Sequence, residues 1–341
     1  MTPAFARYST PFLTHSSVSP SPIIMFEETR FFPNTFTASR NESIPAAING
    51  RTDYFFNRSN PPMEKNPLLV QHLTAEDYAA APFLTVILPL GSLESHGPHL
   101  PFGTDALTAY LLALEVAAQV PKTAVLPPVN YGMSEYYRDF SFTVSLKPET
   151  ETAIIRDVLE SVYREGIRRV FILNGHDGNI PSIEIAARQA KVAHPDFMIV
   201  GLEAWWNMLL PLLPPGFFEV WNGLGHGGEG ELSIGLALFP ELCQPEHARG
   251  IVPQLPPNLD VMWKFSELTT CGASGDPKKA TREKGLVMKE TLVRAMVEAL
   301  QKLDASGWDY RSPDVRQQSQ RENRSDELNG EGNNKYSSKN H

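Results

Sequence analysis

Four short apolar runs alternate with longer amphipathic segments along residues 83–303, and this alternation most constrains the fold. The runs are rich in β-branched residues, the pattern of strands buried on both faces, and they lie at 83–90, 123–129, 168–175 and 196–206. Segments with the apolar spacing of helices lie at 105–120, 147–166, 180–194, 228–240 and 278–303. Alternation at this spacing predicts an α/β fold of three α/β/α layers with a mostly parallel central sheet.

The two ends of the chain differ from this alternating region. Residues 1–62 precede Met63, which reads as a natural start, and we expect them to form a poorly ordered extension outside the core. Residues 311–341 are almost wholly polar, so they cannot bury enough apolar surface to offset chain entropy, and we expect a disordered tail. Residues 63–310 are then expected to form one α/β domain.

The amino-acid composition indicates which kinds of partner the protein does not bind and which cellular compartment suits it. The formal net charge of −9 speaks against nucleic acid or an anionic membrane as a partner. No apolar run approaches the roughly 18 residues of a membrane helix. Cys243 and Cys271 form neither a CxxC pair nor a disulfide framework, which favours a reducing cytoplasm.

The segment "GSLESHGPHLPFGTD" (91–105) places acidic and imidazole side chains directly after the first predicted strand. Glu94 and His96 are two residues apart, so on an extended segment they point the same way. Asp105 follows across a proline-stiffened loop. Oxygen and nitrogen ligands without thiolate suit Zn²⁺, Mn²⁺ or Fe²⁺. The alternative is a hydrogen-bonded turn in which His96 and Asp105 cap element ends.

The segment "NGHDGN" (174–179) follows the third predicted strand and carries His176. Because ligands of parallel sheets bind beyond the carboxyl ends of the strands, we expect this loop and segment 91–105 to leave the same edge. A purely structural role for His176 is about equally open. Asp177 could also be a ligand, but adjacent residues seldom point the same way, so we expect it to lie just behind the ligands or to face solvent.

The segment "GHGGEGELS" (225–233) carries His226, Glu229 and Glu231. It matches G-x-G-x-x-G, but no strand precedes it and its acidic residues would repel a pyrophosphate, so we reject dinucleotide binding. We expect a third arm of the site, with His226 and Glu231 pointing inward. A helix N-terminus with favourably placed acidic residues is the alternative.

A fourth segment, "GASGDPKKATREKG" (272–285), ends where a helix is predicted to start. Free backbone N–H groups at a helix start can hold an anion, and a plain capped turn is equally open. No G-x-S-x-G motif occurs, and neither cysteine has an evident partner base. Serine or thiol catalysis is therefore unsupported.

In order and spacing, four segments resemble the signature segments of the creatininase (creatinine amidohydrolase) family: "LPLGSLESHGPHLPFGTD", "NGHDGN", "GHGGEGELS" and "SGDPKKATREKG". The resemblance covers nearly all of residues 70–305. It implies a single α/β domain with a parallel sheet, assembly into a homo-oligomer, often a hexamer, and two divalent metal ions (Zn, Mn or Fe). Carried over to this chain, it implies that Glu94 and His176 bind one ion, that His96 binds the other, and that Asp105 bridges both.

One departure from the family pattern bears on the substrate. Creatinine-cleaving members carry a glutamate two positions after the histidine of the NGH segment, where this chain has Gly178. The resemblance then implies that Glu231 completes the second metal site, and it disfavours creatinine as the substrate. His226 matches the catalytic histidine of the family.

We therefore expect a metal-dependent amidohydrolase that cleaves a C–N bond of a small-molecule amide, cyclic amide or formamide by a metal-bound hydroxide. His226 would polarise the carbonyl or shuttle a proton, and Glu229 or His226 would protonate the leaving nitrogen. One alternative is a formylaminopyrimidine-nucleotide deformylase, with Lys278 and Lys279 gripping the phosphate. Others are a peptide-trimming or cyclic-ketone (C–C) hydrolase of the same family and a non-enzymatic, metal-binding oligomeric scaffold.

Overall fold

The computed structural model describes residues 64–223, 225–254 and 262–318. The extension predicted for residues 1–62 lies outside the described residues, as does most of the polar tail. Residues 313–318, at the start of that tail, are helical.

The central sheet has four parallel strands in the order β2-β1-β3-β4. They are β1 (Thr85–Leu90), β2 (Thr123–Val125), β3 (Arg169–Asn174) and β4 (Met198–Leu202). Every residue of β1 is buried, as its unbroken apolar sequence predicts for a central strand. The parallel sheet and its helical layers confirm the predicted fold class.

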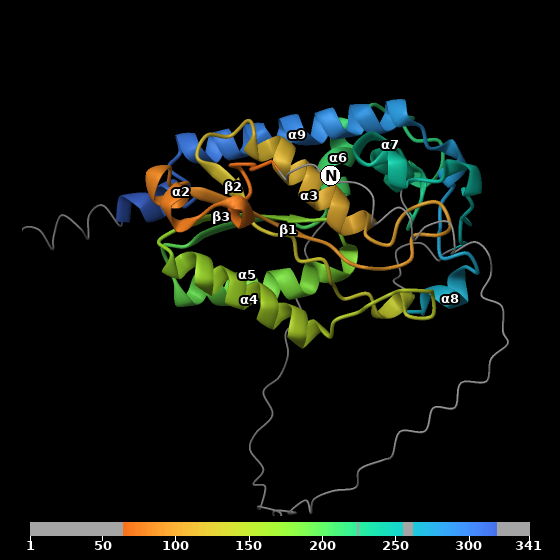
Figure 1. The fold of residues 1–341 in the computed structure, drawn as a ribbon, viewed down its shortest axis with the longest axis horizontal. Helices are drawn as coiled ribbons and strands as arrows, with labels where there is room; N and C mark the ends of the chain where they lie inside the picture. Colours follow the sequence, from red (N-terminus) through yellow and green to blue (C-terminus); the bar gives the residue numbers. More distant parts are fainter. Residues whose placement is uncertain (1–63, 224, 255–261, 319–341) are drawn as a thin grey trace, which may run out of the picture. The chain divides into compact units, whose positions relative to one another are not determined.

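Two helical layers enclose the sheet (Figure 1). One contains α3 (Thr104–Ala117), α6 (Trp205–Leu209), α7 (Glu229–Leu238) and α9 (Arg282–Ala305). The other contains α4 (Pro148–Arg164) and α5 (Ile180–Ala193). The remaining elements are short: α2 (Ala75–Ala80), α8 (Phe265–Leu268), and the 3₁₀ turns η1 (Val70–His72), η2 (Glu135–Tyr137), η3 (Asp177–Asn179), η4 (Leu210–Leu212), η5 (Trp221–Gly223), η6 (Pro240–Leu242), η7 (Pro245–His247) and η8 (Pro277–Lys279).

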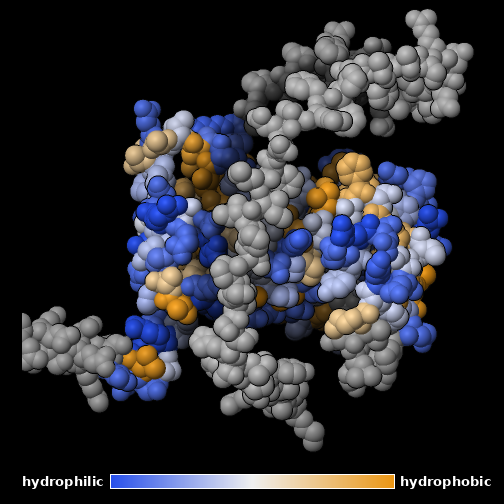
Figure 2. Space-filling view, turned by 90° about the horizontal axis from the view of Figure 1, so that it is seen from below, coloured by the Kyte–Doolittle hydropathy of each residue, from blue (hydrophilic) through white to orange (hydrophobic). Residues whose placement is uncertain are grey.

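Each face of the sheet has its own apolar core, because successive strand residues point to opposite faces. Ile87 packs in the cluster that includes Leu112 of α3 and Leu292 of α9. Its neighbour Leu88 packs on the other face in the cluster that includes Ile155 of α4. The face shown in Figure 2 carries polar residues over most of its uncovered surface, with apolar residues in separate small groups.

Several element ends differ from the sequence prediction for identifiable reasons. β2 stops at Val125, because the prolines at 127 and 128 lack the backbone N–H that a strand ladder requires. The run expected as a strand over 196–206 ends at Leu202, and Trp205 already begins α6. α9 begins at Arg282, where the Thr281 side chain caps it by accepting a hydrogen bond from the Lys284 backbone N–H.

The order of the strands fixes where a ligand site belongs. The chain leaves β1 through α3 towards β2 on one side, whereas it leaves β3 through α5 towards β4 on the other side. The carboxyl ends of β1 and β3 therefore form a topological switch point, the usual ligand position in an open α/β sheet. No helix in the described part of the chain is long and apolar enough to cross a membrane.

Candidate metal centre

Three chain segments meet beyond the carboxyl ends of β1 and β3, and α3 begins among them. A Cβ atom on Gly91, directly after β1, would collide with the backbone of Ala106. A Cβ atom on Gly175, directly after β3, would collide with the carbonyl oxygen of Asp105. The absence of side chains at these two positions lets both strand ends approach the first turn of α3, which carries Asp105.

The carboxylate of Asp105 lies at the centre of this arrangement. Its Oδ1 is 2.9 Å from His96 Nε2, and its Oδ2 is 3.1 Å from His176 Nδ1. The Ser92 hydroxyl donates a hydrogen bond of 2.7 Å to Oδ2. These side chains are all buried. The two oxygens of one carboxylate thus face two different imidazoles.

Two groups of three possible metal ligands share Asp105. One consists of Glu94, Asp105 and His176, and the other of His96, Asp105 and Glu231. Within each group the ligand atoms lie within 4.8 Å of one another, and a further group joins Glu94 and His96 to His226. The structure therefore brings together all five side chains that the sequence singled out as metal ligands.

Backbone carbonyls orient the three imidazoles. His96 Nδ1 lies 3.2 Å from the Glu94 carbonyl oxygen, and His176 Nε2 lies 3.0 Å from that of Met133. His226 Nε2 is hydrogen-bonded to the Ser95 carbonyl oxygen. Because a carbonyl only accepts, each of these nitrogens carries the proton when the ring is neutral. The opposite nitrogen of each ring then faces the carboxylates with its lone pair. In metal sites, hydrogen bonds of this kind fix the orientation of the imidazole ligands.

Glu94 supplies the test of whether this site fits a cation. Its carboxylate is fully buried, and neither oxygen has a hydrogen-bond partner among the residues that the structure describes. Desolvation raises the pKa of this carboxyl group. A buried carboxylate without donors is costly unless a positive charge lies beside it. A protonated His176 supplies such a charge, because its Nε2 lies 3.3 Å from Glu94 Oε2. A divalent cation would supply it in place of that proton, and the oxygen and nitrogen donors around Glu94 suit one.

The pKa values of the two central imidazoles respond to the same acidic surroundings. Burial lowers the pKa of His96, but the charge and hydrogen bond of Asp105 outweigh burial and raise this pKa to about 10. Burial likewise lowers the pKa of His176, whereas Glu94 and Asp105 raise it to about 10. Without a metal, the site therefore offsets its carboxylate charge by holding protons on the imidazoles.

His226 has a different environment from the other two imidazoles. Its ring stacks on Tyr137, with the ring centroids 4.2 Å apart, and its Nδ1 is 3.5 Å from Glu94 Oε1. Desolvation, together with the neighbouring His96, lowers its pKa well below the usual value. His226 is therefore neutral at pH 7, with its unprotonated Nδ1 facing the cluster.

The two glutamates of segment 225–233 have separate surroundings. Oε2 of Glu231 accepts a hydrogen bond from the Gly227 N–H and lies 3.9 Å from His96 Nε2, and burial raises the pKa of this group to about 7. Glu229 is not brought to the cluster. Its carboxylate pairs with Lys284 at 2.6 Å and accepts backbone hydrogen bonds from residues 219 and 220.

A cavity of about 630 Å³ opens beside the cluster, and it extends the site beyond the metal ligands. Its wall includes His226, Tyr137 and the tryptophans at 205, 206 and 221. No motif in the sequence marks Tyr137 or these tryptophans as wall residues. Trp205 belongs to the apolar core and lines the cavity as well.

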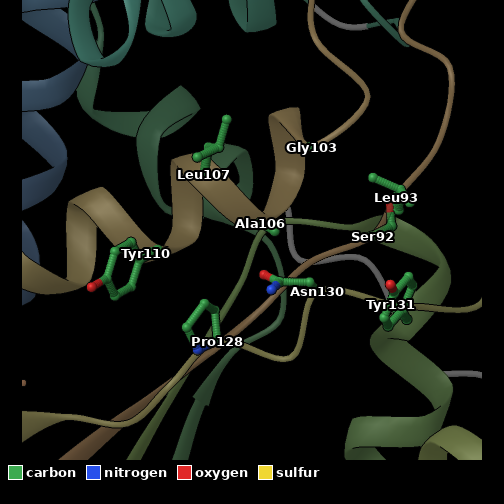
Figure 3. A pocket seen from close by; sticks show the side chains of 9 residues that line it. All are labelled: Ser92, Leu93, Gly103, Ala106, Leu107, Tyr110, Pro128, Asn130 and Tyr131. Carbon is green, nitrogen blue, oxygen red and sulfur yellow. The ribbon is translucent and has the colours of Figure 1, made fainter. Parts of the chain in front are cut away.

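A smaller cavity of about 360 Å³ lies beside Ser92 and the first turns of α3 (Figure 3). No acidic, basic or imidazole side chain occurs among its lining residues, which are Ser92, Leu93, Gly103, Ala106, Leu107, Tyr110, Pro128, Asn130 and Tyr131. Its chemistry is therefore much poorer than that of the cavity beside the cluster. Ser92 links the two regions through its hydrogen bond to Asp105.

The basic part of segment 272–285 lies outside the larger cavity, although Ser274 of the same segment lines it. Neither Lys278 nor Lys279 lines that cavity. Lys279 instead forms an ion pair of 3.0 Å with Glu219, and Pro277–Lys279 forms a short 3₁₀ turn capped by the Asp276 side chain. Of the two possibilities left open by the sequence, the structure displays the capped turn.

The fold and the site define a class of protein: a three-layer α/β domain with a buried cluster of possible metal ligands at its switch point. The chain belongs to the creatininase family, because the family model described as creatinine amidohydrolase matches residues 71–300. The creatinine amidohydrolase of Pseudomonas putida is 31% identical over 252 residues, which are 68% of this chain and 96% of that protein. The family consists of hydrolases and includes amidohydrolases that act on C–N bonds of non-peptide amides, and this chain is a hydrolase.

Solved structures agree with this assignment. A structure titled "Creatininase Mn" has a TM-score of 0.62 and 28% identity, and the match covers 69% of this chain and 98% of that one. A mutant creatininase of "Zn-Zn type" has a TM-score of 0.61 and 29% identity, with 69% and 97% covered. These metal-named structures and the buried ligand cluster support a divalent metal site in this chain.

Two further relatives have different activities in their names. A mycofactocin precursor peptide peptidase of Mycobacterium ulcerans is 29% identical, over 59% of this chain and 78% of that protein. A 2-amino-5-formylamino-6-ribosylaminopyrimidin-4(3H)-one 5'-monophosphate deformylase of Methanothermobacter thermautotrophicus is 31% identical, over 52% of this chain and 67% of that protein. Membership of the family therefore leaves the substrate open.

Proposed function

We propose that this chain is a metal-dependent amidohydrolase that hydrolyses a C–N bond of a small-molecule amide, cyclic amide or formamide. The observation that carries the proposal is the buried Glu94 carboxylate, which has no hydrogen-bond donor in the described part of the chain. It lies in a cluster whose ligand groups share Asp105. The oxygen and nitrogen donors of this cluster are those that a divalent cation takes in proteins.

We assign the ligand groups to two ions. Glu94 and His176 would hold one ion, His96 and Glu231 would hold the other, and Asp105 would bridge them. The donor set suits Zn²⁺, Mn²⁺ or Fe²⁺. Such ions, when bound, polarise a carbonyl group and lower the pKa of water, so that hydroxide is available near pH 7.

His226 is the residue best placed to move a proton. Its Nε2–H is taken up by the Ser95 carbonyl, so this N–H is not free to polarise a substrate carbonyl. Its Nδ1 faces the cluster, and its lowered pKa keeps this nitrogen unprotonated at pH 7. Of the two roles expected for His226, this orientation favours acceptance of a proton and its transfer to the leaving nitrogen.

Glu229 does not suit the role of proton donor. A donor must lie within reach of the leaving group, whereas Glu229 lies outside the ligand cluster and accepts a hydrogen bond of 2.6 Å from Lys284. Its bonds to the backbone of residues 219 and 220 instead tie the wall segment that carries Trp221 to the start of α7. We assign Glu229 a positioning role for this wall.

The deformylase alternative is supported by the methanogen relative, but the cavity fits it poorly. A nucleotide substrate needs a cationic or N–H-rich phosphate site, and no lysine or arginine occurs among the described residues that line the cavity. Assembly into a homo-oligomer and a cytoplasmic location stay predictions.

The proposal is tested by a hydrolysis screen with controlled metal content. Purified protein is chelated, reloaded with Mn²⁺, Zn²⁺ or Fe²⁺, and given creatinine, formamides, hydantoin-like rings and short peptides, with products detected by mass spectrometry. We expect cleavage of a non-peptide amide in the reloaded protein and none after chelation. Equal cleavage in the metal-free protein contradicts the proposal. Full metal occupancy without cleavage of any compound favours the scaffold alternative instead.

A further inference from the structure

The backbone around His226 has little conformational restraint of its own. His226 lies between Gly225 and Gly227, whose φ angles of 110° and 63° fall in the left-handed region. Glycine adopts this region readily because it has no Cβ atom, but it adopts negative φ angles just as readily. The two glycines therefore allow His226 its position without fixing it. Contacts from other segments must hold the imidazole against the ligand cluster.

Ser274 satisfies both backbone hydrogen-bonding groups of His226. The His226 N–H donates a hydrogen bond of 2.9 Å to the Ser274 hydroxyl oxygen, and the Ser274 N–H donates one of 2.7 Å to the His226 carbonyl oxygen. Ser274 is buried, so loss of its hydroxyl would leave the His226 N–H without an acceptor. The pair of bonds therefore fixes the main chain on both sides of the His226 Cα atom.

Ser274 is itself held by a neighbour outside the ligand cluster. It pairs with Ile251 in a parallel β-bridge, and the Gly275 N–H donates a hydrogen bond of 2.6 Å to the Ile251 carbonyl oxygen. On the other side, a Cβ atom on Gly225 would lie 2.7 Å from the Ser274 carbonyl oxygen. Ser274 thus lies between two backbone segments and provides a fixed support for His226.

Segment 91–105 holds the imidazole ring and the peptide group that follows it. The Ser95 carbonyl oxygen accepts a hydrogen bond from His226 Nε2. The His99 Nε2–H donates one of 2.7 Å to the Gly227 carbonyl oxygen. The ring is thus tied to this segment, whereas its main chain is tied to the fourth segment. Both ties are needed to keep Nδ1 facing the ligand cluster.

Segment 272–285 has no other role in the proposed function. It contributes no candidate metal ligand, and its lysines lie outside the cavity. Ser274 does line the cavity, so a direct contact with the substrate is the alternative to a role through His226. The two roles differ in their kinetic effect, because a lost contact weakens substrate binding, whereas a misplaced proton carrier slows the chemical step.

We propose that Ser274 is a positioning residue, which acts through His226 and gives the fourth segment its function. Its two hydrogen bonds keep the His226 ring in one orientation, with Nε2–H on the Ser95 carbonyl and Nδ1 towards the ligand cluster. The inference rests on the proposed function, because it concerns the residue that carries the proton there. It extends that function to a segment that holds no metal ligand.

The tautomer of His226 tests the proposal without turnover. The full Zn²⁺-loaded chain, labelled with ¹⁵N in its histidine rings, is studied by solid-state ¹⁵N NMR at pH 7, and the His226 signals are identified by their loss in His226→Ala. We expect one tautomer in the wild-type chain, with Nε2 protonated and Nδ1 unprotonated. Ser274→Ala removes the hydroxyl that accepts the His226 N–H, so a second set of His226 signals should appear.

Steady-state kinetics with the amide found in the substrate screen give the second measurement. In Ser274→Ala we expect kcat to fall on the order of tenfold, because the proton carrier is misplaced, and KM to stay unchanged. Ser274→Thr keeps the hydroxyl and should restore both the single tautomer and the rate. If Ser274→Ala does not fold, Ser274→Val is compared with Ser274→Thr, because the two differ only in a methyl group that replaces the hydroxyl.

Ser233→Ala is the matched control, because it also removes a buried hydroxyl that holds the fourth segment. The Ser233 hydroxyl donates to the Glu229 carbonyl oxygen at 2.7 Å and accepts a hydrogen bond of 3.2 Å from the Thr281 N–H. Neither bond involves His226, so this variant should keep the His226 tautomer and the rate. Circular dichroism and metal content verify that each variant is folded and loaded.

The outcomes separate this inference from the proposed function. A single, unchanged tautomer in Ser274→Ala overturns the inference, as does a second tautomer in Ser233→Ala. A Ser274→Ala variant that changes KM alone also overturns it and makes the hydroxyl a substrate contact. If the tautomer responds as expected but no compound is hydrolysed, the proposed function alone fails. If hydrolysis depends on metal but the tautomer does not respond, only the positioning role fails.

Discussion

Glu94 and Asp105 show how differently two buried carboxylates behave in one cluster. Asp105 accepts a hydrogen bond from Ser92 and faces two imidazoles, which hold its pKa below the usual range although burial alone would raise it. Glu94 has no comparable donor, and its pKa is raised by desolvation. Glu94 is thus the carboxyl group of the cluster that lacks hydrogen bonds, and it lies between His176 and His226. A cation bound there would remove the imbalance.

Substitution of Asp105 and His226 is expected to separate metal binding from catalysis. Asp105→Ala removes the group shared by both ligand sets, so both ions should be lost. His226→Ala should keep the metal and lower turnover by about 10²–10⁴-fold, the usual contribution of a proton-transfer residue. Plasma emission gives the metal content per chain, and hydrolysis of the amide found in the screen gives the rate.

The control for this pair is Glu229→Gln, in the same segment as His226 but outside the cluster. It should retain its metal content. Full metal retention in Asp105→Ala would remove the bridging role from this residue, and unchanged turnover in His226→Ala would exclude it as the proton carrier.

Metal binding is expected to release protons. In the metal-free protein, pKa values of about 10 keep His96 and His176 protonated at pH 7, whereas a metal ligand must be a neutral imidazole. Lower pH therefore favours the protonated, metal-free site, and affinity rises with pH by up to about tenfold per pH unit for each proton released.

Titration calorimetry with Mn²⁺ in buffers of different ionisation enthalpy counts these protons directly. A binding heat that does not depend on the buffer, together with an affinity that is flat with pH, would mean that both imidazoles are already neutral without metal. The electrostatic description of the cluster would then be wrong.

The sequence predicted some of these residues for reasons that can be stated. Glu94 and His96 are two apart on an extended segment, and the structure places both in the cluster. Glu229 and Glu231 are also two apart but lie in the first turn of α7, where this spacing rotates side chains by about 200°. Only one of them can face the cluster. Tyr137 gave no local signal, because its stacking on His226 joins segments distant in sequence.

At the scale of elements, close packing of α7 against α9 fixes the third arm of the site. A Cβ atom on Gly285 of α9 would overlap the carbonyl oxygen of Ser233 in α7. We expect Gly285→Ala to lower the free energy of unfolding by about 2 kcal/mol, because overpacking between the helices outweighs the better helix propensity of alanine.

Urea unfolding followed by circular dichroism measures this change. Gly201→Ala on β4 is the matched control, because a Cβ atom there meets nothing within 4 Å. Equal stability of the two variants would show that α7 and α9 can move apart without loss.

The layers follow from the alternation of apolar runs and amphipathic segments, and the sequence was sufficient to predict them. The strand order β2-β1-β3-β4 could not be predicted from the sequence. It depends on which strand edges pair, and all four strands offer similar β-branched and leucine side chains, so periodicity does not select the order. Periodicity also does not predict α6, because the end of the apolar run over 196–206 suits a strand and a helix equally well.

For the whole chain, the proposed boundaries of the hydrolase domain lead to a test by truncation. Every candidate metal ligand lies between residues 94 and 231, and every buried core residue of the described part lies from Leu69 to Trp308. Trp308 closes the end of α9, with its Nε1–H donating to Asp304 Oδ1 at 2.7 Å.

We expect residues 63–310, expressed alone, to keep the unfolding temperature, metal content and hydrolysis rate of the full chain. Scanning calorimetry, plasma emission and the hydrolysis assay compare the two proteins. A further truncation before Trp308 is the matched control and should unfold at lower temperature, because it removes a buried side chain and its hydrogen bond. If residues 63–310 alone lost metal or stability to the same extent, the proposed domain boundaries would be wrong.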